Sequence, residues 1–201
     1  MKIKQGARQA RGYEQKARAE AAEASTRRII EAFLKRAETE WFDKVRLEDV
    51  AADADVTVQT VIRKFGNKTG LLDAAHRHLG KTVTVRRVTI PGDVDRAVDA
   101  LARDYAEAAP LILRLLNQEH MHDALKPVLD AGRRGHREWL EQTFAKNLNA
   151  LPAARREAML DALVVAADIY VWKLLRVDMG RSLAAYKQLV KRMICSALAD
   201  K

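Results

Sequence analysis

The sequence predicts an all-α fold, and three observations lead to that prediction. Apolar residues make up 48% of the 201-residue chain, which is enough to build a packed core. Helix-disfavouring residues are few, with nine glycines and four prolines. Apolar residues also recur at helical spacing in one segment after another. Together these features favour a helical globular protein over a disordered chain.

Composition also indicates the compartment. No window holds enough uncharged apolar residues to span a bilayer, so we expect no membrane partner. The charged N-terminus is not followed by the apolar stretch of a secretory signal. The single cysteine, Cys195, excludes an internal disulfide framework and fits a reducing environment. We therefore expect a cytoplasmic protein.

Two short helical patterns flank a polar turn between Leu47 and Phe65. The apolar positions of each pattern fall on one face: Leu47, Val50, Ala51 and Ala54 in the first, and Val58, Val61, Ile62 and Phe65 in the second. Asp53 and Asp55 mark the turn, and Thr57 can cap the second helix. This pattern predicts a helix-turn-helix, whose second helix enters the major groove of DNA.

The charge pattern of the second helix also favours DNA. Residues 56–72 carry three basic side chains and no acidic one, although the chain has 27 Asp and Glu. A helix that faces phosphates excludes carboxylates. In the major groove Gln59 can bond adenine and Val58 can touch a thymine methyl. The other DNA-binding candidates are Arg27 at the expected helix start Thr26–Arg28, Thr60, Arg63, Lys64, and Lys68 in the first turn of the next helix.

The segment Val56–Phe65, followed by Asn67-Lys68 and Leu71-Leu72, resembles the signature of the tetracycline-repressor-like (TetR) transcriptional regulators. The resemblance extends upstream over Thr26–Trp41, the first helix of a three-helix DNA-binding domain. It implies a second, helical domain that binds a small-molecule effector and forms a homodimer. Such a dimer would present two recognition helices to two half-sites, so we expect the operator to be an inverted repeat in double-stranded DNA.

Three residues depart from the family pattern. Asp55 replaces the usual glycine of the turn, but aspartate tolerates a left-handed backbone better than most residues. Ile62 replaces a tyrosine that often bonds a phosphate, so that contact is absent. Arg46 replaces the usual Thr or Ser at the start of the second helix, where it loses a cap but can reach a phosphate itself.

The expected organisation has three parts. Residues 1–24 form a basic N-terminal arm, 25–80 the DNA-binding domain with the helix-turn-helix at about 47–66, and 81–201 the effector-binding and dimerisation domain. Within the arm, Tyr13–Ala24 has good helix formers and no breaker, which suits an upstream extension of the next helix. The arm is either a solvated tail or a segment that contacts DNA.

Several helices are expected in the last part of the chain. Asp93 can cap the first of them, Pro110 suits the first turn of a short helix, 111–118, and Pro127 opens another. Gly132 and Gly135 suggest a close approach by another helix or a bound molecule. Aromatic and apolar residues are typical of ligand pockets and of cores alike. The candidate ligand-binding residues are Tyr105, Leu115, Trp139 and Tyr170.

Two C-terminal segments predict the dimer contact. Ala162–Leu175 is apolar on all sides except at Asp168 and Lys173, so it must be buried against its own subunit and another. Leu183–Leu198 carries an apolar stripe. Two such helices from each of two chains would form a four-helix interface. Asp168 is expected to bond a polar partner across a helix interface.

Enzyme, cofactor and metal signals are weak. No Gly-rich phosphate cradle, nucleophile elbow or metal-ligand motif occurs. The pairs His76/His78 and His120/His122 stand at i and i+2, which places their side chains on nearly opposite helix faces. We therefore expect no enzyme activity, cofactor or metal site. The expected function is transcriptional repression relieved by a small apolar or aromatic ligand; the alternative is a constitutive or architectural DNA-binding protein without an effector.

Overall fold

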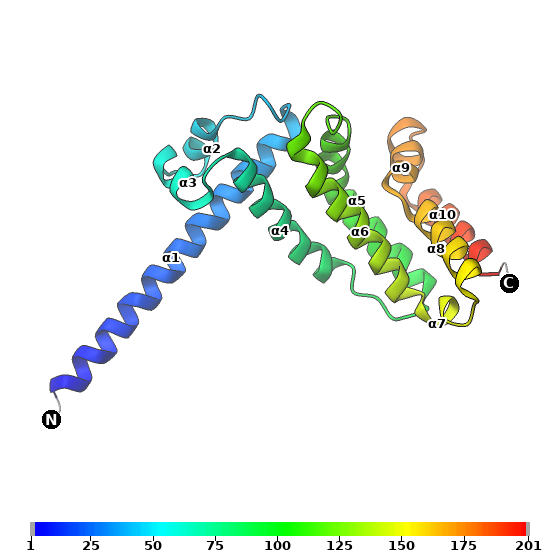
Figure 1. Ribbon diagram of the computed structural model, residues 1–201, viewed down its shortest axis with the longest axis horizontal. Coiled ribbons are helices and arrows are strands. Elements are labelled where there is room, and N and C mark those ends of the chain that lie inside the picture. Colours follow the sequence, from blue (N-terminus) through cyan, green and yellow to red (C-terminus); the bar gives the residue numbers. More distant parts are fainter. Residues whose placement is uncertain (1–2, 200–201) are drawn as a thin grey trace. The chain divides into compact units, whose positions relative to one another are not determined.

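A computed structural model describes the backbone of residues 3–199 and the side chains of residues 15–199. Every regular element in this range is helical, as predicted (Figure 1). The elements are α1 (Ile3–Thr39), α2 (Leu47–Asp53), α3 (Val58–Phe65), α4 (Lys68–Arg86), α5 (Val94–Leu116), η1 (Asp123–Leu125), α6 (Lys126–Thr143), α7 (Ala145–Leu148), α8 (Ala153–Ala167), α9 (Ile169–Trp172), η2 (Lys173–Asp178) and α10 (Leu183–Ala199).

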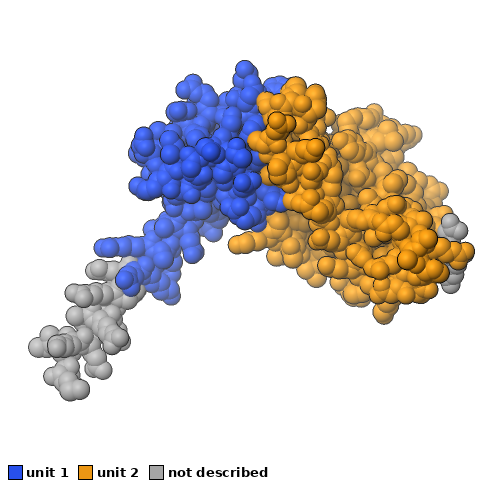
Figure 2. Space-filling view, viewed as in Figure 1, with its two compact units in different colours: residues 1–78 blue, residues 79–201 orange. Residues whose placement is uncertain are grey.

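The chain divides into two compact units, residues 1–78 and residues 79–201 (Figure 2). Helices α1 to α3 lie in the first unit, and α5 to α10 lie in the second. Helix α4 begins in the first unit and ends in the second. Among residues 3–199, no helix is long and apolar enough to cross a bilayer.

The first unit is built around the downstream half of α1. Its buried face packs with α2, and α2 packs with α3. The buried apolar residues of the unit include Ile29, Ile30, Phe33, Ala37, Val50, Ala51, Ala54, Val61, Leu71 and Leu72. Upstream, α1 runs on through Tyr13–Ala24, as the helix formers predicted. The expectation that a helix starts at Thr26–Arg28 was wrong, because these residues lie inside α1.

Local signals fix the turn between α2 and α3. Asp55 adopts the left-handed conformation with φ of 53°, which confirms that it can replace glycine there. The Thr57 hydroxyl accepts from the Thr60 amide at 3.2 Å, the expected cap of α3. After α3, Gly66 also has a positive φ, and Gly70 is required because a Cβ there would lie 2.0 Å from the Phe65 carbonyl oxygen.

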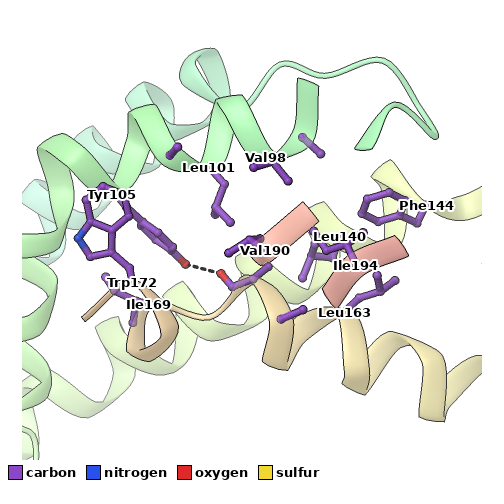
Figure 3. Close-up of a cluster of buried hydrophobic side chains, with 14 of the residues drawn as sticks. Val98, Leu101, Tyr105, Leu140, Phe144, Leu163, Ile169, Trp172, Val190 and Ile194 are labelled. Carbon is purple, nitrogen blue, oxygen red and sulfur yellow. Dashed lines mark hydrogen bonds between the residues drawn. The ribbon is translucent and has the colours of Figure 1, made fainter. Parts of the chain in front are cut away.

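The core of the second unit lies between α5, α6, α8, α9 and α10 (Figure 3). It includes Val98, Leu101, Tyr105, Leu140, Phe144, Leu163, Ile169, Trp172, Val190 and Ile194. The cap of α5 is as expected, since Asp93 accepts from the Arg96 amide at 2.9 Å. Pro127 stands in the first turn of α6, also as expected.

Two expectations about the second unit, those for Pro110 and for the segment 162–175, were wrong. Pro110 lies inside α5 rather than opening a new helix; Pro110 and Ala106 are both exposed, so water can reach the carbonyl that loses its donor. Nothing in the described part of the chain lies within 4 Å of a Cβ built on Gly132 or Gly135, so no helix of the same subunit approaches them, and an approach by a bound molecule stays a prediction. The segment 162–175 is not one helix, because the backbone becomes extended at Asp168.

Asp168 explains this break. Its side chain accepts from the Tyr170 amide at 2.8 Å and thereby caps α9. The carboxylate thus serves a local backbone donor, rather than the partner across a helix interface that was expected. Downstream, η2 is a π-helical turn of six residues that ends before Gly180, which has a φ of 60°.

Candidate functional site

The outer face of α3 presents polar side chains, whereas its inner face is buried in the first unit. Val61 is fully buried, whereas Gln59 and Arg63 are exposed. These two residues are four positions apart, so they lie one turn apart on the same face. Thr60 is half-buried, and its hydroxyl lies 3.0 Å from that of Thr57. The exposed amide and guanidinium are groups that read base edges or phosphates in the major groove.

Lys64 connects α3 to α1. Its ammonium donates to the Ala22 carbonyl oxygen at 3.1 Å and to the Thr26 hydroxyl oxygen at 2.8 Å. Nearby, the Arg28 Nε donates to the Ala54 carbonyl oxygen at 3.2 Å, at the turn of the helix-turn-helix. Two of the three ammonium protons of Lys64 are therefore engaged inside the unit, and a DNA contact by this residue stays a prediction.

Lys68 makes hydrogen bonds that the sequence did not predict. Its ammonium donates to the carbonyl oxygens of Phe42, Asp43 and Val45 at 2.8, 3.2 and 3.1 Å, and lies 4.8 Å from the centre of the Phe42 ring. Desolvation by burial lowers the pKa of Lys68. All three protons have acceptors in the loop before α2, which favours a structural role for Lys68, and a DNA contact by this residue stays a prediction.

Arg27 and Arg46 are both exposed. Arg27 lies within α1, with its Nε 3.9 Å from a carboxylate oxygen of Glu31, so the helix N-terminus invoked for it is absent. Arg46 precedes α2 without capping it, and its Nε lies 3.7 Å from Glu48. Both pairs are surface contacts of little energetic weight, so both guanidinium groups remain candidate phosphate contacts.

The structure brings together two of the four candidate ligand residues. Tyr105 is buried, and its hydroxyl donates to the Ala167 carbonyl oxygen at 3.0 Å (Figure 3). Trp139 is half-buried, and its Nε1 donates to the Arg87 carbonyl oxygen at 2.9 Å. Leu115 is buried ten positions further along α5, about 15 Å from Tyr105 at the helical rise. Tyr170 is 54% exposed.

A buried guanidinium lies against both rings. The Arg87 guanidinium carbon is 5.3 Å from the centre of the Tyr105 ring and 5.2 Å from that of Trp139. Its Nε and Nη2 bond the fully buried carboxylate of Asp104 at 2.8 and 2.6 Å, and its Nη1 lies 2.9 Å from the Nδ1 of His136. The surroundings of Tyr105 and Trp139 therefore combine aromatic faces with a charge pair.

Sequence reasoning missed this cluster, although one signal was present. Asp104 follows Leu101 by three positions and so falls on the apolar stripe of α5. A carboxylate on a buried face needs a cationic partner. The sequence could have revealed that need, but it could not have revealed that Arg87, just past the end of α4, supplies the partner.

Burial controls the protonation of this cluster. Desolvation, together with the nearby Arg87 charge, lowers the pKa of His136 to about 3, so its Nδ1 can accept from the guanidinium. Its Nε2 is buried and has no hydrogen-bond partner among the described residues. The Tyr186 hydroxyl is also buried without such a partner, and desolvation raises the pKa of Tyr186. Desolvation raises the pKa of Tyr105 too.

The second unit also exposes large apolar side chains between the end of α8 and the start of α10. They are Val165, Tyr170, Leu174, Val177, Met179 and Leu183. These residues fall in or beside the two segments expected to form the dimer contact. Within α10, Ile194 is buried in the unit's own core and Leu189 is half-buried.

No family model matches the sequence, and no curated protein matches it either. Solved structures do match. A protein assigned to the TetR family of transcriptional regulators, from Rhodococcus sp., superposes with a TM-score of 0.72 at 14% identity, over 88% of this chain and 100% of the other. A TetR-family regulator from Streptomyces coelicolor gives 0.65 at 18% identity, over 89% and 90% of the two chains. A TetR regulator from Rhodococcus sp. RHA1 gives 0.53 at 21%, over 89% and 97%.

The fold and the outer face of α3 define a class of two-unit helical proteins with an N-terminal helix-turn-helix. Within that class, the chain has the fold of the TetR-family transcriptional regulators. The resemblance read from the sequence is confirmed at the level of the fold.

Proposed function

We propose that this protein is a sequence-specific DNA-binding transcriptional regulator. The observation that carries the proposal is α3 itself, which exposes Gln59 and Arg63 within the acid-free segment 56–72. Helix α1 supports α3 from behind through Lys64, so the outer face is held in one orientation. A rigid helix with an amide and a guanidinium on its free face is suited to the major groove.

The proposed assembly is a homodimer. The exposed large apolar residues between Val165 and Leu183 support it, because apolar side chains exposed in such number on neighbouring elements suggest a protein interface. A two-fold axis through that surface would present two copies of α3. Their target would then be an inverted repeat, with half-sites about one helical turn, 34–36 Å, apart.

The proposed regulation is repression that an effector relieves. An apolar or aromatic molecule that took the place of the Arg87 guanidinium on the rings of Tyr105 and Trp139 would detach this residue from α5. Arg87 directly follows α4, the helix that begins in the first unit, so its release would free the end of α4. Reciprocity would then require operator DNA to weaken effector binding by the factor with which the effector weakens DNA binding.

A constitutive or architectural DNA-binding protein is the second candidate. One observation favours it: the ring faces of Tyr105 and Trp139 are already covered by Arg87. Such a protein needs no effector and no sequence preference.

Selection of bound duplexes from a random pool tests the proposal. A regulator enriches one inverted repeat, whereas an architectural protein enriches no defined sequence and prefers deformable or bent DNA. Recovery of duplexes without a common motif would contradict the proposal. The effector is tested separately, by titrating each compound that binds with and without the selected operator.

A further inference from the structure

The Arg87 guanidinium lies in surroundings that would suit a separate cation. Its carbon is 5.3 Å from the centre of the Tyr105 ring and 5.2 Å from that of the Trp139 ring. Aromatic faces carry negative charge density and attract cations, most strongly where water is excluded. The fully buried carboxylate of Asp104 adds a whole negative charge beside the two rings. The protein has therefore built a cation site in its second unit, and its own side chain fills it.

Both rings of this site are held in place without the guanidinium. The Tyr105 hydroxyl donates to the Ala167 carbonyl oxygen at 3.0 Å (Figure 3). The Trp139 Nε1 donates to the main-chain carbonyl oxygen of Arg87 at 2.9 Å. Neither hydrogen bond involves the Arg87 side chain, so both can persist when that side chain moves away.

Arg87 uses only one oxygen of the Asp104 carboxylate. Its Nε and Nη2 both bond Oδ2, at 2.8 and 2.6 Å. The other oxygen, Oδ1, is buried and has no hydrogen-bond partner among the described residues; its ion pair with the Arg86 Nη1 is 3.8 Å long. A planar cation that is not tied to the chain can donate to both oxygens of a carboxylate at once. Such a cation would gain a hydrogen bond that Arg87 does not make.

The buried carboxylate also decides the charge of any molecule that replaces the guanidinium. A neutral molecule on the two rings would leave Asp104 with only the long ion pair to Arg86, and an uncompensated buried charge is strongly destabilising. His136 adds a second requirement, because its Nδ1 accepts from the guanidinium Nη1 at 2.9 Å. The replacement must therefore be positively charged and must carry several N–H donors.

The chain around Arg87 has little else to hold it. Across the described residues 79–96, Arg87 is the only residue that is buried; the others are half-buried or exposed. Arg87 directly follows the last residue of α4 and belongs to the connection that leads to α5. Displacement of this one side chain would therefore release the end of α4 without exposing a core residue.

We propose that the site formed by Asp104, Tyr105, His136 and Trp139 binds a planar aromatic cation of the amidinium or guanidinium class in place of the Arg87 guanidinium. The proposal rests on the effector-relieved regulation proposed above, and it narrows the effector from any apolar or aromatic molecule to a positively charged one. Without ligand, Arg87 is the occupant of the site. Its competition lowers the affinity of the ligand by the fraction of molecules in which the site is vacant.

Calorimetric titration of the full chain with benzamidine tests the charge requirement. Benzamide is the matched control, because it is planar and of nearly the same size but neutral. The wild type should bind benzamidine at least about tenfold more tightly than benzamide, since this is the smallest factor expected for hydrogen bonds to a charged group. Equal affinities, or no binding of benzamidine, would overturn the inference.

Arg87→Ala tests whether binding occurs at this site. The variant removes the competing guanidinium, so it should bind benzamidine at least about tenfold more tightly than the wild type. Arg103→Ala, which removes an exposed guanidinium from α5, should bind it like the wild type. Arg87→Ala combined with Asp104→Asn removes both charges and should lose the preference for benzamidine over benzamide. An unchanged affinity in Arg87→Ala would overturn the inference.

Arg87→Ala leaves Asp104 buried without its main counter-ion and so can unfold in plain buffer. In that event benzamidine, but not benzamide, should restore its helical circular dichroism; failure of benzamidine to do so would also overturn the inference.

These measurements contain no DNA, so their outcome is independent of the DNA-binding function. A wild type that bound benzamidine equally with and without operator would contradict the effector role and leave the cation site standing.

Discussion

The Arg87 guanidinium donates to the Asp104 carboxylate through both Nε and Nη2, at 2.8 and 2.6 Å, and the side chains of both residues are buried. Arg87 follows the last residue of α4, and Asp104 lies on α5. The preceding Arg86 adds an ion pair to the same carboxylate at 3.8 Å. The end of α4 is thus joined to α5 by charges that water cannot screen.

Asp104→Asn should destabilise the second unit by about 3–5 kcal/mol, because it leaves the Arg87 charge buried without a counter-ion. The free energy of unfolding in urea measures the effect. Asp99→Asn on the same helix is the control: it breaks the half-exposed pair with Lys187 and should cost at most about 1 kcal/mol. If Asp104→Asn lowered the free energy of unfolding no more than Asp99→Asn does, the buried ion pair would contribute no more to stability than the half-exposed one.

His136 should make stability fall in acid. Its pKa is about 3 in the folded protein and has its ordinary value of about 6.5 in the unfolded chain, so between these values only the unfolded chain binds the proton. The stabilisation that the neutral His136 gives the folded protein is complete above about pH 6.5. Below that pH the free energy of unfolding falls by up to about 1.4 kcal/mol per pH unit. Unfolding in urea at pH 7 and pH 5 should show a smaller difference for His136→Gln; an equal difference would refute the assignment.

Lys68→Met should weaken folding rather than the salt dependence of DNA binding. The substitution leaves the carbonyls of Phe42, Asp43 and Val45 without their donor, at a cost of about 2–3 kcal/mol. Arg63→Gln should do the opposite. It should change the free energy of unfolding by less than about 0.5 kcal/mol and make the affinity for DNA less dependent on salt. If Lys68→Met flattened the salt dependence and left the unfolding free energy unchanged, Lys68 would be a phosphate contact after all.

Leu174→Glu combined with Val177→Glu should give a folded monomer with weakened DNA binding. Both side chains are more than half exposed, so the change charges a surface rather than a core. Ile194 is unsuitable for this test because it is almost completely buried in its own subunit. Sedimentation equilibrium measures the result, and Val88→Glu, at a position 73% exposed outside this surface, should stay dimeric. A wild-type monomer at micromolar concentration would rule out the proposed assembly.

Features that depend on a few neighbouring residues could be predicted from the sequence. The cap by Thr57, the left-handed Asp55 and the cap by Asp93 each depend on one side chain and the backbone next to it. The helix-turn-helix follows from the same local chemistry together with the spacing of apolar residues.

Features that depend on distant partners could not be predicted. The sequence does not indicate that the Lys68 ammonium has hydrogen-bond acceptors, because its three acceptors lie 23 to 26 residues upstream. Arg87 and His136 are 49 residues apart and meet only through the packing of the second unit. The break at Asp168 was missed for a different reason, since apolar residues on both sides concealed a local cap.

Parallel selection of random duplexes by the wild type and by Gln59→Ala tests whether α3 reads DNA. The wild type should enrich an inverted repeat with half-sites about 10–10.5 base pairs apart. Gln59→Ala should bind that repeat about 1–3 kcal/mol more weakly and lose its preference at one base pair in each half-site. If Gln59→Ala selected the same repeat with undiminished preference at every position, α3 would not read DNA through this residue.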